Sequence, residues 1–329
     1  MRRNQIKNPY LRFTFCVGLF PPAAGHVRRL FLPLLFIFAV YQSNAATQYP
    51  LTFLDSLERQ VTLASVPKRL ITIGPANTEI IFAIGAEKQL VGVDKYSNYP
   101  QAAKEITQIG GLISPFFDKI VSLNPDLVIV GASTNPEIVD KLVDLGVTVA
   151  KIAPSNLNEI YGATDLLGQI FDRQPHANQV VAKMKQRVNR VQEVVHAIPK
   201  TERLWVFYEL WHDPLRSAGP GSFIHELIEL AGGVNIAGDA KTAWPHFSLE
   251  TLVARNPQVI FTTRKESLTE LEAGHRKAWT GISAVETNRI YLLDADEISR
   301  PGPRVVRAIE AIAQSLYPER FEADTANKQ

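Results

Sequence analysis

Two kinds of hydrophobic pattern alternate along this chain. Short runs in which nearly every position is apolar predict buried strands, and they read "RLITIG" (69–74), "LVGVD" (90–94), "LVIV" (127–130) and "VTVAKI" (147–152). Between them, "TEIIFAIGA" (78–86), "FFDKIVSLN" (116–124) and "NPEIVDKLVDLG" (135–146) repeat apolar residues every three or four positions, as helices do. Strands without a polar face that alternate with helices predict a parallel sheet covered on both sides. We expect this first α/β unit over 67–171, after a β-hairpin over 50–66.

A second unit repeats the pattern. Strands are expected at 203–210, 259–263 and 289–294, and helices at 222–233, 248–256 and 303–317. Between the units, apolar residues at steps of three and four over 175–199 predict one helix of about 22 residues, or about 33 Å. It either packs on one domain or joins two lobes, and its central position favours the second. The predicted fold is α/β, with two Rossmann-like lobes of mostly parallel strands, one long interlobe helix and a ligand cleft between the lobes.

Two sequence motifs recur in both units. "DKIVSLNPDLVI" and "ETLVARNPQVIF" match Asp118 with Glu250, and "TEIIFAIG" and "HELIELAG" match Glu79 with Glu226. We interpret Glu79 and Glu226 as acids near helix N-termini, where a negative charge is favoured.

Composition narrows the class of protein. The 329 residues, 46% hydrophobic and 21% charged, suit a soluble globular protein of two domains. The formal net charge of +2 includes six basic residues and no acids in 1–45, so the remainder carries −4. A mildly acidic body gives no support for nucleic-acid binding.

The N-terminal region has the order of a secretory signal peptide. Two arginines precede the apolar run 30–40, which is too short to span a bilayer, and Ser43 and Ala45 place cleavage after Ala45. The stretch before Val27 is a possible upstream extension, and a membrane-anchored N-terminus is the alternative. The only cysteine, Cys16, lies in this leader, so we expect no disulfide, no cysteine metal site and no lipid anchor. Export without an anchor predicts a periplasmic protein.

Catalytic signatures are missing from the sequence. It has no G-x-S-x-G, P-loop, H-E-x-x-H or strand-linked G-x-G-x-x-G motif, and "HELIE" ends at Glu229 where a zinc protease needs histidine. We therefore expect no enzyme and no catalytic cofactor. The six histidines after residue 45 are scattered, which argues against a metal site and against a zinc or manganese receptor with the same two-lobe layout.

Ordered motifs now support a resemblance. "RLITIGPANTEIIFAIG", "LVGVDKYSNYP", "NPDLVIV", the long helix, "AGGVNIAGD", "AWPHFSLETLVARNP" and "ISRPGPR" follow one another over about 49–317. In this order they resemble periplasmic substrate-binding proteins of ABC importers for cobalamin, haem and iron–siderophores. "PANTE", "YSNYP", "WPHFSLE" and "RPGPR" are most similar to the cobalamin-binding branch.

The resemblance implies a function, partners and a division of the chain. A corrinoid would be held between the lobes and delivered to an inner-membrane permease dimer with a cytoplasmic ATPase, by a monomer that binds no nucleic acid. The implied division is a signal peptide (1–45), an N-terminal lobe (46–172), an interlobe helix (173–199), a C-terminal lobe (200–318) and a tail (319–329). Haem or an iron–siderophore is the alternative ligand. Haem would need a tyrosine or histidine aimed at iron, and a siderophore would favour several basic residues in the cleft.

The candidate site residues come from both lobes. The resemblance implies ligand contacts for Tyr96 and Trp244, each of which could instead have a packing role. Tyr208, Trp211 and Arg300 follow or end predicted strands, where α/β proteins bind ligands. His212 and His246 are possible axial metal ligands, although most loop histidines are only solvated or hydrogen-bonded.

The matched acids have a different implied role. In the family, one acid on each lobe pairs with arginines of the permease, and Asp118 and Glu250 occupy those places; support of the helix dipole is the alternative explanation. The sequence also departs from the cobalamin-binding pattern. Two further aromatics expected in the first lobe fall on Leu112 and Gly131, and the family's second-lobe disulfide is missing.

Overall fold

Antiparallel strands β1 (Leu51–Leu54) and β2 (Gln60–Leu63) form the predicted hairpin at the start of the first lobe. The computed structural model describes residues 46–326, so the predicted signal peptide and Cys16 lie outside the described residues. Asp55 closes the hairpin turn, because its carboxylate accepts from the backbone N–H groups of Leu57 and Arg59. The same carboxylate accepts from the N–H of Lys151, 3.1 Å away, and so ties the hairpin to the sheet.

The first lobe contains the predicted parallel sheet, with strand order β4-β3-β5-β6. Its strands are β3 (Leu70–Ile73), β4 (Leu90–Val93), β5 (Leu127–Val130) and β6 (Val149–Lys151), and its helices are α1 (Pro75–Ala83), α2 (Phe117–Ser122) and α3 (Pro136–Asp144). All four residues of β3 and of β5 are buried, in agreement with their apolar sequences. Helix α1 starts three residues earlier than predicted, because a proline is tolerated in the first turn, where its missing N–H is not needed.

The second lobe repeats this sheet with the order β10-β7-β11-β12, again all parallel. The strands are β7 (Trp205–Glu209), β10 (Val234–Asn235), β11 (Val259–Thr262) and β12 (Ile290–Leu292). The helices are α6 (Phe223–Leu230), α7 (Leu249–Arg255), α8 (Lys265–Glu272), α9 (Ser283–Glu286), α10 (Ala295–Ser299), α11 (Val305–Leu316) and α12 (Pro318–Ala326), the last of which covers most of the expected tail. A small hairpin of β8 (Trp211–His212) and β9 (Leu215–Arg216) follows β7. Short 3₁₀ turns occupy Glu87–Gln89, Gln101–Glu105, Lys200–Glu202 and Lys277–Trp279.

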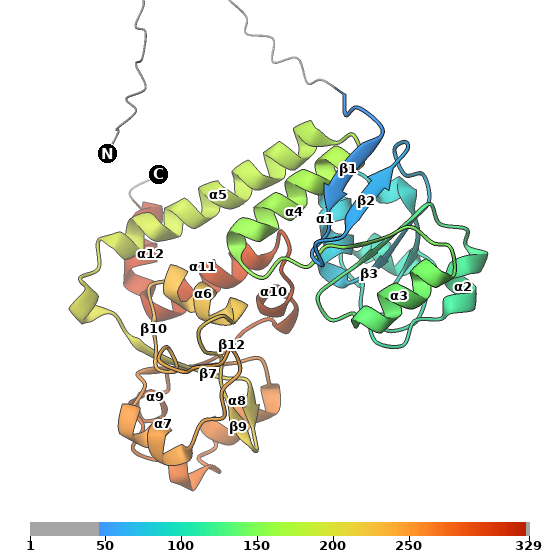
Figure 1. Cartoon of the computed structure of the whole chain (residues 1–329). Helices are drawn as coiled ribbons and strands as arrows, with labels where there is room; N and C mark the ends of the chain where they lie inside the picture. The colour runs from blue at the N-terminus through green and yellow to red at the C-terminus, as the bar shows by residue number, and fades with distance from the viewer. Residues whose placement is uncertain (1–45, 327–329) are drawn as a thin grey trace, which may run out of the picture. The chain divides into compact units, whose positions relative to one another are not determined.

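Two helices, rather than one, connect the lobes. The predicted long helix is α5 (Gln174–His196), and α4 (Leu157–Ile170), which we did not predict, lies beside it (Figure 1). In α5, Ala177 packs in the core of the first lobe and Met184 in the core of the second. In α4, Leu167 packs in the core of the first lobe and Leu157 in the core of the second. Each helix therefore contributes to both cores, which makes the connection stiff.

Among residues 46–326, no helix is long and apolar enough to cross a bilayer.

Candidate functional site

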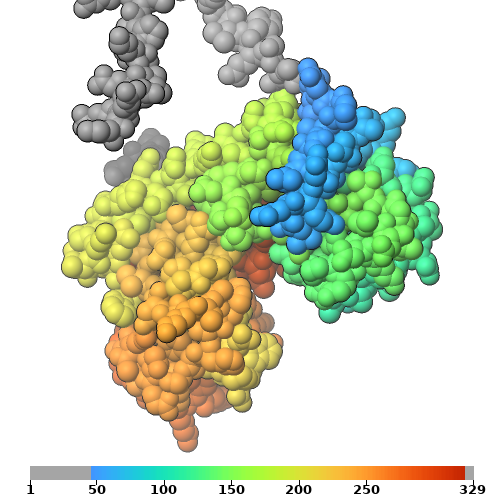
Figure 2. Space-filling view, in the orientation of Figure 1, coloured from blue at the N-terminus to red at the C-terminus, as the bar shows by residue number. Residues whose placement is uncertain are grey.

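The carboxyl ends of both parallel sheets border two adjoining cavities between the lobes. The first has a volume of about 350 Å³ and is lined by residues that follow β3, β5 and β6 and by residues near the end of α10. The second, of about 440 Å³, is lined largely by the second lobe. They share Ala132, Ala153, Pro154, Ser299 and Pro301, so they form one continuous cleft. Figure 2 shows the hollow between the blue-to-green lobe and the orange lobe.

Tyr96 lies on the wall of the first cavity with 48% of its surface exposed. Its loop is fixed by Asp94, a fully buried residue that the sequence analysis did not single out. The Asp94 carboxylate accepts from the N–H of Tyr96 at 2.8 Å, from the N–H of Gly74 at 2.9 Å and from the hydroxyl of Ser97 at 2.7 Å. The first-lobe aromatic is thus positioned by a buried carboxylate directly after β4.

Arg300 lines the same cavity, but its guanidinium already binds groups of both lobes. It donates to Glu79 at 3.1 Å, to the side chain of Asn98 at 2.8 Å and to the carbonyl of Tyr96 at 3.2 Å. It also pairs with Asp296 at 2.7 Å. The structure therefore brings the predicted residues Tyr96 and Arg300 together, and it leaves the charge of Arg300 neutralised by carboxylates.

The interpretation of Glu79 as a helix N-terminal acid is wrong. No acid lies in the first turn of α1, and Glu79 is 4% exposed. Its carboxylate also accepts from Arg304 at 2.8 and 2.9 Å, and this raises the pKa of the Arg304 guanidinium despite its partial burial. Arg304 in turn lies 4.1 Å from the ring centre of Tyr99. The partners of Glu79 were missed because they belong to the other lobe.

Glu226, the matching acid of the second lobe, does lie in the first turn of its helix, α6. It too makes a contact beyond its own helix, since its carboxylate accepts from the N–H of Leu157 at the start of α4, 3.0 Å away. Burial raises the pKa of Glu226, and the nearby charge of Glu159 acts in the same direction, whereas the Leu157 hydrogen bond lowers it.

Tyr208 and Trp244 line the second cavity. Trp244 is 42% exposed, whereas Tyr208 is almost fully buried, and that burial raises the pKa of its hydroxyl, with a hydrogen bond to Thr263 acting against the shift. The apolar side chains Leu210, Phe223 and Ile224 complete this part of the wall. The second cavity can therefore hold an apolar, planar surface against Trp244.

Trp211 lies elsewhere, on the β8–β9 hairpin, and lines neither cavity. Its indole N–H donates to the carbonyl of Asp213 at 2.9 Å, and the guanidinium of Arg264 lies 4.1 Å from its ring centre. His212 and His246 are likewise not among the residues that line the two cavities.

Asn77 is a site residue that the sequence analysis did not single out, although it lies within the "PANTE" motif. It lines the first cavity, is 1% exposed, and donates from its side-chain nitrogen to the carbonyl of Ile152 at 3.0 Å. This bond fixes the orientation of the amide, and its oxygen has no hydrogen-bond partner in the described part of the chain. A buried acceptor without a partner costs free energy unless something donates to it. Leu112 and Gly131, where the resemblance leads one to expect aromatics, line the same cavity.

Asp118 and Glu250 lie on the surface, outside the cleft. Each is exposed and occupies the first turn of its helix, α2 or α7. A hydrogen bond with its own backbone N–H, then one with Ser248, keeps the pKa of Glu250 below its usual range. Both acids are thus exposed to a partner.

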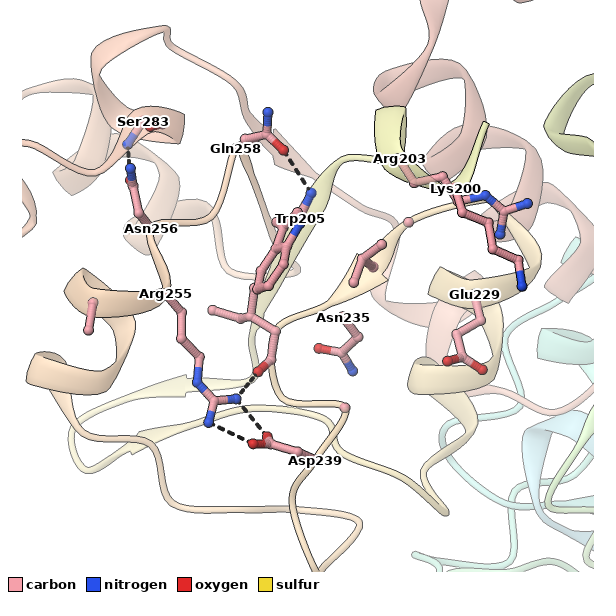
Figure 3. Close-up of a pocket in the computed structure, with 15 residues that line it drawn as sticks. Lys200, Arg203, Trp205, Glu229, Asn235, Asp239, Arg255, Asn256, Gln258 and Ser283 are labelled. Carbon is pink, nitrogen blue, oxygen red and sulfur yellow. Dashed lines mark hydrogen bonds and ion pairs between the residues drawn. The ribbon is translucent and has the colours of Figure 1, made fainter. Parts of the chain in front are cut away.

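A third cavity lies at the opposite edge of the second sheet, at the amino ends of β7 and β11, and has a volume of about 1290 Å³ (Figure 3). Trp205, 47% exposed, stands in this cavity, and its backbone N–H donates to the side chain of Gln258. Arg255 binds Asp239 through two hydrogen bonds of 2.6 and 2.8 Å. None of the predicted ligand contacts lies here, and in α/β sheets ligands bind at the carboxyl ends of the strands.

Over residues 46–326, no group of three or more His, Cys, Asp or Glu side chains is placed to hold an ion.

The sequence is similar to that of known binding proteins along most of its length. The sequence model of the family described as "Periplasmic binding protein" matches residues 70–297. The chain is 31% identical over 279 residues to YvrC, an uncharacterized ABC transporter substrate-binding lipoprotein of Bacillus subtilis; the match covers 83% of this chain and 88% of that protein. It is also 31% identical over 252 residues to a vitamin B12-binding protein of Vibrio cholerae, with 76% and 89% covered.

Solved structures show the same fold. A crystal structure of the periplasmic vitamin B12 binding protein BtuF of Vibrio cholerae matches with a TM-score of 0.67 at 29% identity, over 80% of this chain and 99% of that one. The periplasmic heme-binding protein RhuT of Roseiflexus matches with a TM-score of 0.68 at 26% identity, over 77% and 99%. The predicted two-lobe α/β fold is thus confirmed.

Proposed function

Because this chain belongs to the periplasmic binding protein family, we propose that it is the solute-binding component of an ABC importer and that it captures cobalamin or a related corrinoid. The similarity to proteins named for vitamin B12 binding supports this ligand. The ligand is cargo rather than a catalytic cofactor, and the protein acts as a carrier rather than an enzyme. We place it in the cleft, against Tyr96, Tyr208 and Trp244, with Arg300 at the wall and Trp211 as an outer contact.

The shape of a corrinoid suits these side chains. A corrin ring is broad and flat, apolar at its centre, and carries amide groups at its rim. Tyr96 and Trp244 present exposed rings from the two lobes, and rigid aromatic faces provide contact area at a low cost in conformational entropy.

The charge distribution in the cleft supports a corrinoid over haem. The unpartnered oxygen of Asn77 is buried behind the wall of the first cavity, so it does not contact a ligand in the cleft as the structure stands. Within the described residues, Arg300 is the only basic residue that lines either cavity, and Glu79 and Asp296 already neutralise it. The lining of the cleft therefore offers the carboxylates of an anionic chelate little compensation.

Haem is the second candidate, because the similarity to RhuT favours it and because Tyr96 is exposed in the cleft. Absorption spectra separate the two. Purified protein mixed with excess cyanocobalamin and then desalted should keep the red colour at one ligand per chain. If haemin is retained instead and cyanocobalamin passes through, the corrinoid proposal is wrong.

The partner of the loaded protein is proposed to be an inner-membrane permease dimer with a cytoplasmic ATPase. Export through a cleaved signal peptide would deliver the protein, as a monomer, to the periplasm. There, Asp118 and Glu250 would pair with one arginine on each permease subunit, which favours orientation and rapid association. Asp118→Ala combined with Glu250→Ala should abolish cobalamin uptake and leave ligand binding intact; normal uptake by this variant would refute the docking role.

A further inference from the structure

Each of the two matched surface acids is followed, one helical turn later, by an exposed valine. Val121 follows Asp118 in α2, and Val253 follows Glu250 in α7. The two valines are 43% and 45% exposed. Because residues i and i+3 share one face of a helix, each lobe presents a carboxylate beside an apolar side chain.

The acid and the valine sit in the same local structure in both lobes. Ile120 and Leu252, which precede the valines, are fully buried in their lobes, so both helices are anchored by the same position. Asn124 and Asn256 then leave the helices with left-handed backbones, at φ 44° and 42°. A proline follows each asparagine, and a buried strand comes next.

Within α2 and α7, the similarity of the exposed side chains is confined to the acid and the valine. Phe116, two residues before Asp118, is 60% exposed, but its counterpart in the second lobe is Ser248. Lys119 likewise corresponds to Thr251. A single exposed valine on a protein surface is ordinary and needs no explanation. A valine at the same offset from the matched acid in both lobes points to a partner that has two equivalent binding positions.

We propose that Asp118 with Val121, and Glu250 with Val253, form a two-point docking epitope for a dimeric membrane protein. Each subunit of this partner presents a guanidinium next to an apolar side chain. The inference rests on the proposed function and adds to it a second, apolar component of the docking contact. The acid directs the encounter, and the removal of valine surface from water adds affinity that salt does not screen.

A competition assay tests the epitope without knowledge of the cargo. Fluorescently labelled wild-type protein is bound to right-side-out membrane vesicles from the bacterium that encodes it, and unlabelled variants compete. Val121→Ser combined with Val253→Ser should compete roughly tenfold more weakly than wild type, from the loss of two apolar contacts. Val143→Ser is the matched control, since Val143 is 48% exposed on α3 and belongs to neither pair.

The outcomes distinguish the two proposals. If the double serine variant competes as well as Val143→Ser while Asp118→Ala with Glu250→Ala competes weakly, the valine inference is wrong and the acid docking stands. If both double variants compete like wild type, or if no saturable binding is found, the docking proposal fails and the inference fails with it. Equal binding of the wild type to protein-free lipid vesicles would also overturn the inference, because the partner would then be the lipid surface.

Discussion

Arg300 of the second lobe and Glu79 of the first form a buried ion pair, with 3.1 Å between the nitrogen Nη1 and the oxygen Oε1. Their side chains are only 9% and 2% exposed. Arg304 binds the same carboxylate, so one acid of the first lobe pairs with two guanidinium groups of the second, and Asp296 and Glu297 supply further negative charge. Together with α4 and α5, this cluster connects the two lobes at the edge of the cleft.

Glu79→Gln should lower the free energy of unfolding by roughly 3 kcal/mol, because two guanidinium groups would lose a buried counter-charge. Urea unfolding at pH 7 measures this change. Arg307→Gln is the control, since Arg307 is 48% exposed and its pair with Glu297 should contribute under 1 kcal/mol. Equal effects of the two substitutions would show that the interlobe cluster does not stabilise the fold.

Trp244→Ala should weaken cyanocobalamin binding about 10- to 100-fold with little change in melting temperature, because the loss of an exposed aromatic anchor costs contact area in the complex alone. Titration calorimetry measures the affinity. Trp205→Ala is matched in residue type, lobe and exposure but lies at the opposite edge of the sheet, so it should bind as wild type does. A greater loss of affinity in Trp205→Ala would move the site to the large cavity of Figure 3.

The pH dependence of stability should carry a contribution from Glu226. Burial raises its pKa above the ordinary 4.5, so between these two values the folded state binds more protons than the unfolded state. The resulting stability is complete below pH 4.5 and is lost as the pH rises through the raised pKa. Glu226→Gln, which still offers an oxygen to Leu157, should lack this loss when urea unfolding is repeated from pH 4 to pH 8.

Glu159 should contribute to the pH dependence of stability in the opposite direction, and Glu159→Gln should remove that contribution. Hydrogen bonds from the backbone and hydroxyl of Ser155 lower the pKa of Glu159, so its contribution is present above pH 4.5 and disappears as the pH falls through the lowered pKa. If both variants showed the same pH trend, the assignment of these two carboxyls would be wrong.

The contact between α4 and α5 can be tested with two glycines of α4. A Cβ at Gly168 would lie 2.5 Å from the Cβ of Ala177, so Gly168→Ala should destabilise the protein by about 1–3 kcal/mol through overpacking. A Cβ at Gly162 meets no heavy atom within 4 Å, and Gly162→Ala should instead stabilise the helix by about 0.5–1 kcal/mol. Thermal unfolding of the two variants should therefore shift in opposite directions. Shifts of the same sign would contradict the close approach of the two helices.

Much of the fold could be predicted from local pattern, because a covered parallel sheet needs strands that are apolar on both faces. Helix α4 was missed although its apolar residues recur at helical spacing, with buried side chains at Leu157, Ile160, Leu167 and Ile170. The hairpin β8–β9 has only two residues in each strand, too few for any period to appear.

In the candidate site, residues near strand ends could be predicted, whereas contacts with partners far along the chain could not. Tyr96, Tyr208 and Arg300 reach the cleft because they lie at or beyond the carboxyl ends of parallel strands. The partners of Glu79 and Asn77 could not be predicted, since they lie 221 and 75 positions away along the chain. Hydrogen bonds over such separations depend on how the lobes and strands pack, which no local pattern encodes.

The central claim is that the cleft prefers a corrinoid, and a calorimetric titration panel of cyanocobalamin, haemin and ferric siderophores tests it most directly. We expect one-to-one binding of cyanocobalamin, and binding of haemin at least tenfold weaker, since Arg300 of the cleft wall is already paired with Glu79 and Asp296. No measurable binding of any corrinoid, together with tight binding of haemin, would contradict the account.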